Sequence, residues 1–350
     1  MTLTVHRSRR VWVAIVVGAI ALAVLPFLVK NYRVFQFNLV LVYAIAILGL
    51  NILTGYNGQI SLGHGAFYAI GAYTAAILME RVGLPYWATW PLAGVVCFGF
   101  GFLMGFPALR LGGHYLAVAT LALALAIPQL LKYKAIEAYT GGVQGIVLTK
   151  PEPPFTFRFL GQPFNADRWL YFVTLAVTVV MFVLAWNLLR GRVGRALIAI
   201  RDHPIAATAM GINLPVFKST AFGVSAAFTG VAGALGASVI AFVSPDSFTV
   251  TLSIFLLVGM VVGGLATIPG AFFGAMFIQF VPNIADEISK SAPAAIYGVL
   301  LIMLMYLMPT GVMGLVHTLW SRHGPGAARR HGAGATASGV PAPPALTKET

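Results

Sequence analysis

The feature that most constrains this chain is a succession of apolar runs, each about as long as a lipid bilayer is thick. A helix needs about 20 apolar residues, with a rise of ~1.5 Å each, to cross ~30 Å of hydrocarbon. The pattern predicts an all-α polytopic membrane protein with about ten transmembrane helices. The predicted spans are Val11–Val29, Val34–Leu53, Ile60–Met79, Trp87–Pro107, Tyr115–Leu131, Trp169–Leu189, Ser219–Val243, Thr249–Leu265, Pro269–Ala285 and Pro293–Met308.

The composition agrees with a chain that faces lipid. Of its 350 residues, 59% are hydrophobic and only 9% are charged, whereas a soluble domain has roughly 25% charged residues. The run Val11–Val29 is longer than the ~7–15 apolar residues of a signal peptide, so we expect a retained span. The net charge of +13 comes from basic residues at the ends of runs. That position is typical of membrane anchoring and argues against nucleic-acid binding.

The distribution of Lys and Arg predicts that both chain ends lie in the cytoplasm. The tail before the first run carries Arg7, Arg9 and Arg10, and cytoplasmic segments are enriched in basic residues. The C-terminal segment, rich in Gly, Ala, Pro and Arg, cannot bury a core. The predicted parts are a transmembrane domain over 1–320, a periplasmic loop over 132–168, a cytoplasmic loop over 190–218 and a disordered cytoplasmic tail over 321–350.

The positions of the acidic residues argue against two classes of function, ion-coupled carriers and membrane enzymes. None of the nine Asp and Glu residues falls in the middle of a predicted span. Ion-coupled carriers usually hold a carboxylate inside the helix bundle, and enzymes need acids or metal ligands there. The chain also lacks the Gly-x-x-x-x-Gly-Lys-Ser/Thr phosphate loop, and Cys97 is its single cysteine. We therefore expect no catalytic residues, no metal site and no cofactor, so that another chain must energise any active transport.

A segment rich in glycine and polar residues, Gly55–Gly65, interrupts the third run and suggests a broken or re-entrant helix. Non-helical backbone at membrane depth is tolerated where it lines a cavity, and its free amides could hold a carboxylate. The alternative is an interfacial loop that only packs, with His64 as a packed histidine. The candidate substrate-pathway residues are Asn57, Gly58, Gln59, Ser61, Gly63, His64 and Gly65.

Glycines also recur at helical spacing within the apolar runs. Small residues three or four apart form a groove where helices approach closely. The pattern predicts ordinary bundle packing, with a sliding surface for helix tilting as the alternative. The spaced glycines are Gly101 and Gly105, Gly230, Gly233 and Gly236, Gly259 and Gly263, and Gly270 and Gly274.

The predicted cytoplasmic loop contains two short helices. The first covers Gly194 to Asp202, and the second covers Pro204 to Met210, with Asp202 or His203 as its cap and Gly211 as the residue that ends it. A helix of this length spans only ~10 Å, so it cannot cross the membrane. It has a small, alanine-rich face and carries Ile205, Ala206, Ala207 and Met210, so it could dock into a groove of another protein, or it could be a plain surface helix. The candidate coupling residues are Arg195, Arg201, Asp202, Pro204, Ala206, Ala207 and Gly211.

Several of these stretches resemble the permeases of branched-chain amino acid ABC transporters. They occur in the expected order between Gly49 and Gly314, and they are similar to the second of the two homologous permeases of such systems. One residue departs from the general coupling pattern Glu-Ala-Ala-x-x-x-Gly, because Ile205 stands in place of Glu. The matching stretches are Gly49–Leu78, Gly194–Leu197 with Ala206–Asn213, Phe242–Phe248 and Val262–Ala271.

The resemblance implies a permease subunit that does not hydrolyse ATP itself. Its partners would be a homologous second permease, two cytoplasmic ATP-binding subunits and a periplasmic solute-binding protein. It would lie in the bacterial inner membrane, in contact with lipid, and its substrate would be a branched-chain or related neutral amino acid. The alternative from another class is a secondary carrier or channel for small solutes that works without ATPases.

Overall fold

The computed structural model describes residues 22–110, 113–155, 158–159, 162–288, 290 and 292–323, and most of these residues are helical. The predicted disordered tail, 321–350, lies outside the described residues from residue 324 onward. The longer helices are α2 (Asn31–Asn51), α3 (His64–Glu80), α4 (Tyr86–Arg110), α5 (His114–Leu131), α7 (Ala166–Arg190), α8 (Arg192–Asp202), α10 (Leu214–Ile240), α11 (Val250–Gly263), α12 (Gly270–Ile288), α13 (Pro293–Leu307) and α14 (Gly311–His323).

Short elements join these helices. They are a π-helix (Ile52–Tyr56), the 3-10 turns Lys134–Ile136 and Pro245–Ser247, the helices α6 (Glu137–Thr140) and α9 (Pro204–Ala209), and the two-residue strands β1 (Ile146–Val147), β2 (Arg158–Phe159), β3 (Gln162–Pro163) and β4 (Phe242–Val243).

Seven helical segments in the described part of the chain are long and apolar enough to cross a membrane. The chain is therefore a multi-pass membrane protein, but the expected count of about ten spans is not supported. Of the predicted span Val11–Val29, residues 11–21 lie outside the described residues. In place of Ile60–Met79, α3 has only 17 residues, because the glycine-rich segment delays its start. In α12, polar side chains, including Gln279 and Asn283, interrupt the run of apolar residues that a span needs.

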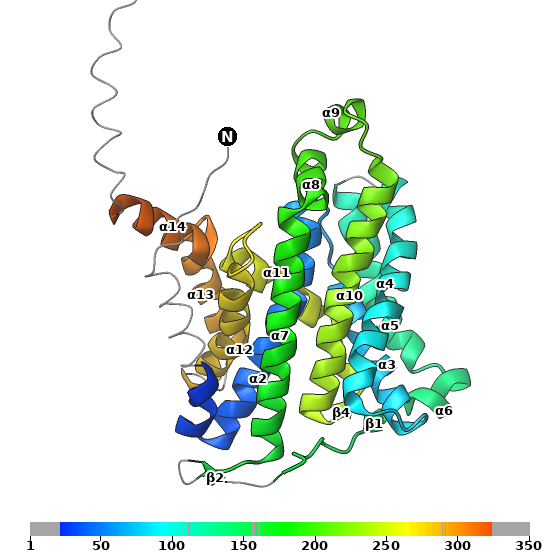
Figure 1. Cartoon of the computed structure of the whole chain (residues 1–350), viewed down its shortest axis with the longest axis vertical. Coiled ribbons are helices and arrows are strands. Elements are labelled where there is room, and N and C mark those ends of the chain that lie inside the picture. The colour runs from blue at the N-terminus through cyan, green and yellow to red at the C-terminus, as the bar shows by residue number, and fades with distance from the viewer. Residues whose placement is uncertain are drawn as a thin grey trace, which may run out of the picture.

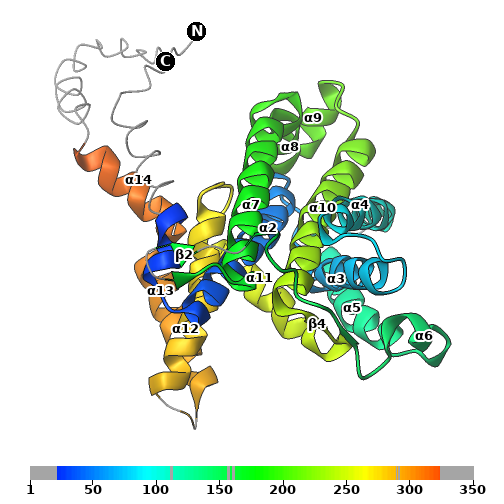
Figure 2. The same cartoon turned by 60° about the horizontal axis from the view of Figure 1, so that its bottom comes forward.

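Helices α10 and α2 form the centre of the bundle. In these two spans 83% and 78% of the residues are buried, compared with 6% in the span that begins in α13. Helix α10 packs against α2, α3 and α4, whereas α2 also packs against α7 and α12. Figure 2 shows α3, α4 and α5 on one side of this centre, and α12 and α13 on the other. Buried residues, most of them apolar, lie on all sides of both central helices over most of their length, so both helices lie mainly inside the bundle.

Close helix approach explains the spaced glycines. A Cβ on Gly233 would lie 2.1 Å from the Tyr68 carbonyl oxygen, and one on Gly274 would lie 1.9 Å from the Gly259 oxygen. Real Cβ atoms do not come so near to backbone atoms, so only glycine permits these crossings. The prediction of ordinary bundle packing is confirmed at these positions.

The two long loops lie at opposite ends of the bundle, as the alternation of spans predicts. Helices α8 and α9 stand at the top of Figure 1, whereas α6, β1 and β2 lie at the bottom. We call these the α8–α9 end and the β1 end. At the β1 end, strand β1 pairs antiparallel with β4, with Ile146 opposite Val243. Lys132 also forms an ion pair of 2.5 Å with Asp246. The long loop is thus fastened across the end of the bundle.

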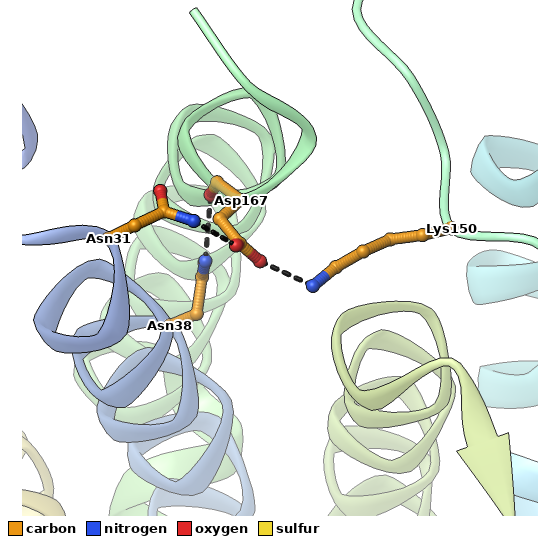
Figure 3. A network of polar contacts seen from close by, with 4 residues as sticks. All are labelled: Asn31, Asn38, Lys150 and Asp167. Atoms are coloured by element: carbon orange, nitrogen blue, oxygen red, sulfur yellow. Dashed lines mark hydrogen bonds and ion pairs between the residues drawn. The ribbon is translucent and has the colours of Figure 1, made fainter. Parts of the chain in front are cut away.

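Asp167 ties three segments together at the β1 end (Figure 3). Its carboxylate accepts a hydrogen bond of 2.7 Å from the Asn31 amide and pairs with Lys150, and its backbone oxygen accepts one of 3.0 Å from Asn38. The start of α2, the start of α7 and the long loop therefore meet at one residue.

Candidate functional site: the broken helix and the α8–α9 segment

The structure contains a break between α2 and α3. The chain leaves α2 through the π-helix Ile52–Tyr56, runs without helical structure over 57–63, and becomes helical again at His64. Gly58 has a φ of 74°, and its N–H donates to the Thr54 oxygen at 3.2 Å. Positive φ is the backbone conformation that favours glycine at a helix end. The glycine-rich segment therefore forms a true interruption of the helix.

Most amides of the break are already bonded within the chain. We expected free amides that could hold a carboxylate, but the residues around the break take up these donors. Buried hydroxyls from distant helices accept several of them. The N–H groups of Gly58 and Gln59 donate to the backbone oxygens of Thr54 and Leu53, respectively. The N–H groups of Leu62, Gly63 and Gly65 donate to the hydroxyls of Thr120, Ser61 and Ser253, respectively.

His64 is fully buried and both of its ring nitrogens are engaged. Ser225 Oγ donates to the Gly49 oxygen at 2.6 Å, so it must accept from His64 Nε2, which lies 2.7 Å away. Nδ1 is then the acceptor for the Ser61 hydroxyl at 3.1 Å. A serine has one hydrogen to donate, which fixes this arrangement. His64 therefore serves as a structural link between α3, α10 and the break, which agrees with a packed histidine.

The two polar side chains at the start of the break bond to each other. Asn57 Nδ2 donates to Gln59 Oε1 at 2.7 Å, while Asn57 Oδ1 is buried with no partner in the described part of the chain. Buried polar atoms are nearly always satisfied. Asn57 Oδ1 is therefore an unusual unsatisfied acceptor within the break.

Arg201 connects the break to the α8–α9 segment. Its Nη1 donates to the Gly55 carbonyl oxygen at 2.9 Å, and its Nε pairs with Asp202 at 2.9 Å. A Cβ on Gly58 would come within 2.8 Å of Arg201 Cγ. The two groups of predicted site residues thus meet at one side chain, and a cleft opens beside it. Its lining includes Asn57, Gly58, Gln59, Leu116, Arg201 and Lys218.

Helix α9 ends as predicted. Gly211 has a φ of 84°, and its N–H donates to the Thr208 oxygen at 2.9 Å, while the Ile212 N–H donates to the Ala207 oxygen at 3.0 Å. These are the two bonds of a Schellman motif, in which the residue of positive φ closes the helix. The expected cap is absent, because neither Asp202 nor His203 makes a side-chain bond to the start of α9.

The exposed surface of α9 differs at one residue from the one expected. Ala207 is only 3% exposed, because it packs against its own chain, whereas Ile205 is 87% and Met210 is 84% exposed. The alanines therefore do not form a common outer face. A partner that approaches this end of the bundle would meet the two bare apolar side chains of Ile205 and Met210. Arg195, on α8, is also exposed.

The acidic residues lie where the sequence predicted. Every described Asp or Glu occupies a loop or a helix end, and all are exposed except Asp167, which is partly buried in the contacts of Figure 3. Among the described residues, no group of three or more His, Cys, Asp or Glu could hold a metal ion. The described bundle thus offers no buried carboxylate for ion coupling.

Sequence reasoning missed the residues that bind the break from outside. Ser225 anchors His64 from 161 positions away. Asn51 accepts from the Ala266 N–H at 2.9 Å and donates to the Thr267 oxygen at 2.8 Å, which secures the loop between α11 and α12. A polar residue inside an apolar run was the available signal, because such a residue needs a partner.

Comparison with known proteins decides the family. Residues 32–309 match the family of the branched-chain amino acid transport system permease component. The chain belongs to this family. The permease protein LivM of the high-affinity branched-chain amino acid transport system of Salmonella typhimurium is 36% identical over 307 residues, which are 82% of this chain and 71% of that protein.

Further family members show which type of permease the chain resembles. The LivM protein of Escherichia coli is 36% identical over 320 residues, covering 86% of this chain and 74% of that protein. The LivH permease of the same organism is 25% identical over 289 residues, covering 78% and 91%. The expected similarity to the second permease, LivM, is thus confirmed. No solved structure shows significant similarity to the chain.

Proposed function

We propose that the chain is one permease subunit of an ABC importer that carries branched-chain or related neutral amino acids across the bacterial inner membrane. Membership of the permease family supports this most directly, since LivM and LivH are named as permeases of such a transport system. In the proposed assembly the chain pairs with a homologous second permease, two cytoplasmic ATP-binding subunits and a periplasmic solute-binding protein. Both chain ends face the cytoplasm.

ATP-driven work must then enter through a contact with another protein, because the sequence contains no phosphate loop. The α8–α9 end supports this role. Helix α9 lies beyond the ends of the long helices (Figure 1). Ile205 on α9 and Met210 at its end are exposed apolar side chains, and apolar anchors on a short helix suit a groove on a partner. Arg201 then links that contact to the break at Gly55.

Co-purification from native membranes tests the assembly. A tagged copy of the chain should bring down ATP-binding subunits and a second permease. A secondary carrier or channel would purify without them, and its solute uptake would continue after cellular ATP is depleted while the proton gradient is maintained. Recovery of the tagged chain alone, together with uptake that does not depend on ATP, would refute the proposed importer.

A panel of labelled solutes tests the substrate class. We expect uptake of leucine, isoleucine or valine, because the described spans offer no buried carboxylate to pair with a solute of net charge, and the buried Arg168 already donates to the backbone oxygens of Pro26 and Pro163. The assay uses cells that lack other importers of these amino acids, with and without this chain. Transport limited to dicarboxylates or sugars would contradict the proposed substrate.

A further inference from the structure

Two rows of polar side chains face one another on neighbouring helices of the bundle. On α12 they are Gln279, Asn283 and Glu287, spaced four residues apart, which places them on one side of the helix. On α2 they are Gln36 and Tyr43, seven residues apart. Helices α2 and α12 pack directly together, with the rings of Phe37 and Phe280 5.5 Å apart.

The inner part of the space between them is a small cleft of about 180 Å³. Its lining combines the polar side chains of Tyr43, Gln279 and Asn283 with the apolar side chains of Leu252, Phe255 and Ile278. The cleft is smaller than the ~300–1,000 Å³ of pockets for drug-sized ligands. It therefore matches a small solute with one polar and one aliphatic end.

Several hydrogen-bonding groups of this cleft have no hydrogen-bond partner in the described part of the chain. The Tyr43 hydroxyl and the Gln279 amide make no hydrogen bond with any residue that the structure describes, and Asn283 donates only to the Gln279 backbone oxygen, at 2.6 Å. Tyr43 lies about 18 Å along the span from Asn31, near its middle. An unpaired amide that faced hydrocarbon there would be destabilising by several kcal/mol, so these groups need a polar partner, which water or a solute can supply.

The cleft continues outward to a wider mouth. Asn283 also borders a second cleft of about 420 Å³, together with Arg33, Gln36 and Glu287. Arg33 and Glu287 approach this mouth from opposite helices, and no ion pair joins them in the described part of the chain. Arg33 instead donates to Gln36 at 3.2 Å. A zwitterion carries both charges that this pair of side chains complements.

We propose that the cleft between α2, α11 and α12 is this chain's binding site for a zwitterionic aliphatic amino acid during its passage through the membrane. The proposal rests on the proposed function and assigns the site to a different place from the Gly55–Gly65 segment. Arg33 and Glu287 receive the charged groups at the mouth, Tyr43 and Gln279 hold them inside, and Leu252 and Phe255 contact the aliphatic side chain.

Water access to the cleft is the first test. Single cysteines replace Gln279, Asn283 or Phe273 in a Cys97→Ala background, and opened membranes containing the whole transport complex are treated with a small charged thiol reagent. Gln279→Cys and Asn283→Cys should react at least about tenfold faster than Phe273→Cys, because only a hydrated thiol ionises readily. Phe273 lies on the same helix but outside the cleft. Equal rates at all three positions would overturn the proposal.

Transport by the whole complex is the second test. Gln279→Leu and Tyr43→Phe should each lower leucine uptake about tenfold, which is the effect of losing roughly one hydrogen bond. The matched control is Gln129→Leu, because Gln129 is an exposed glutamine on α5 and borders none of these clefts. All variants should retain the ATP-binding subunits in a pull-down.

The outcomes separate the two proposals. If the wild-type complex takes up leucine and both cleft variants match it, the cleft is not the binding site and the proposed function stands. If the wild-type complex takes up no aliphatic amino acid, the proposed function itself is wrong, and the cleft loses its assigned solute with it.

Discussion

At the scale of single residues, buried hydroxyl groups hold the break in place. The Ser225 hydroxyl lies between the Gly49 oxygen and His64 Nε2, so one side chain joins α2, α10 and the start of α3. A buried hydrogen-bonding group that loses its partner destabilises a fold by ~1–3 kcal/mol. The geometry of the break therefore depends on residues far from it in the sequence.

Ser225→Ala should lower the stability of the protein by ~1–3 kcal/mol, because His64 and the Gly49 oxygen would each lose a partner. Ser247→Ala is the matched control, since Ser247 is an exposed serine and its loss should have little effect. The measurement is the midpoint of thermal unfolding of the protein purified in detergent. Equal midpoints for the two variants would contradict the assigned network.

The contact between Gly58 and Arg201 gives a second prediction at this scale. Gly58→Ala should be worse than Gly83→Ala, although both residues have positive φ, 74° and 70°. Both variants bear the strain of roughly 1 kcal/mol for a non-glycine residue in that conformation. Only Gly58→Ala also overpacks, by ~1–3 kcal/mol, because its Cβ would lie 2.8 Å from Arg201 Cγ, whereas nothing lies within 4 Å at Gly83.

Gly58→Ala should therefore lower both leucine uptake and the midpoint of thermal unfolding by more than Gly83→Ala does. Gly83→Ala serves as the control for backbone strain alone. If Gly58→Ala and Gly83→Ala behave alike in both measurements, the contact with Arg201 plays no part in positioning the break.

At the scale of elements, α9 is a short helix with a fixed end and a bare apolar face. Ile205→Asp and Met210→Asp should each abolish most of the pull-down of ATP-binding subunits, because a charge would replace an apolar anchor. Thermal stability should change little, since both side chains are more than 80% exposed. Val143→Asp, at the β1 end, is the matched control, since Val143 is 62% exposed. Full retention of the ATP-binding subunits by both variants would show that α9 is a plain surface helix.

Two other substitutions on α9 should act differently from these. Ala207→Arg would bury a charge against the chain itself, since Ala207 is 3% exposed, and Gly211→Val would place a β-branched residue at a φ of 84°. Both should therefore lower stability as well as subunit association. Loss of association without any loss of stability in Ala207→Arg would mean that this alanine faces the partner.

At the scale of the whole molecule, the orientation in the membrane follows from the opposite positions of the two loops. In a Cys97→Ala background, Val143→Cys should react with an impermeant thiol reagent in intact cells, whereas Thr208→Cys should react only after the cells are opened. Both side chains are exposed, so reagent access depends on the side of the membrane. The reverse pattern would place the α8–α9 end outside.

The sequence was a good guide to local features and a poor one to distant contacts. The end of α9 at Gly211 and the break after Tyr56 were predictable, because glycine has a local conformational meaning. The count of about ten spans is not supported in the described part of the chain, since α3 starts only at His64 and α12 carries Gln279 and Asn283. The contact of Arg201 with Gly55 spans 146 positions, and no local rule relates residues so far apart.

The contacts of Asp167 have a mechanical consequence. Because they fasten the start of α7 to α2 and the long loop, we infer that this point is a pivot for α7. Helix α7 has 25 residues and is thus a lever of ~37 Å that ends beside α8. A rocking of about 5° would swing the α8 end by roughly 3 Å while the pivot stayed still. Arg201 would carry that swing to the break, and spin labels at the two ends of α7 would reveal it as unequal displacements.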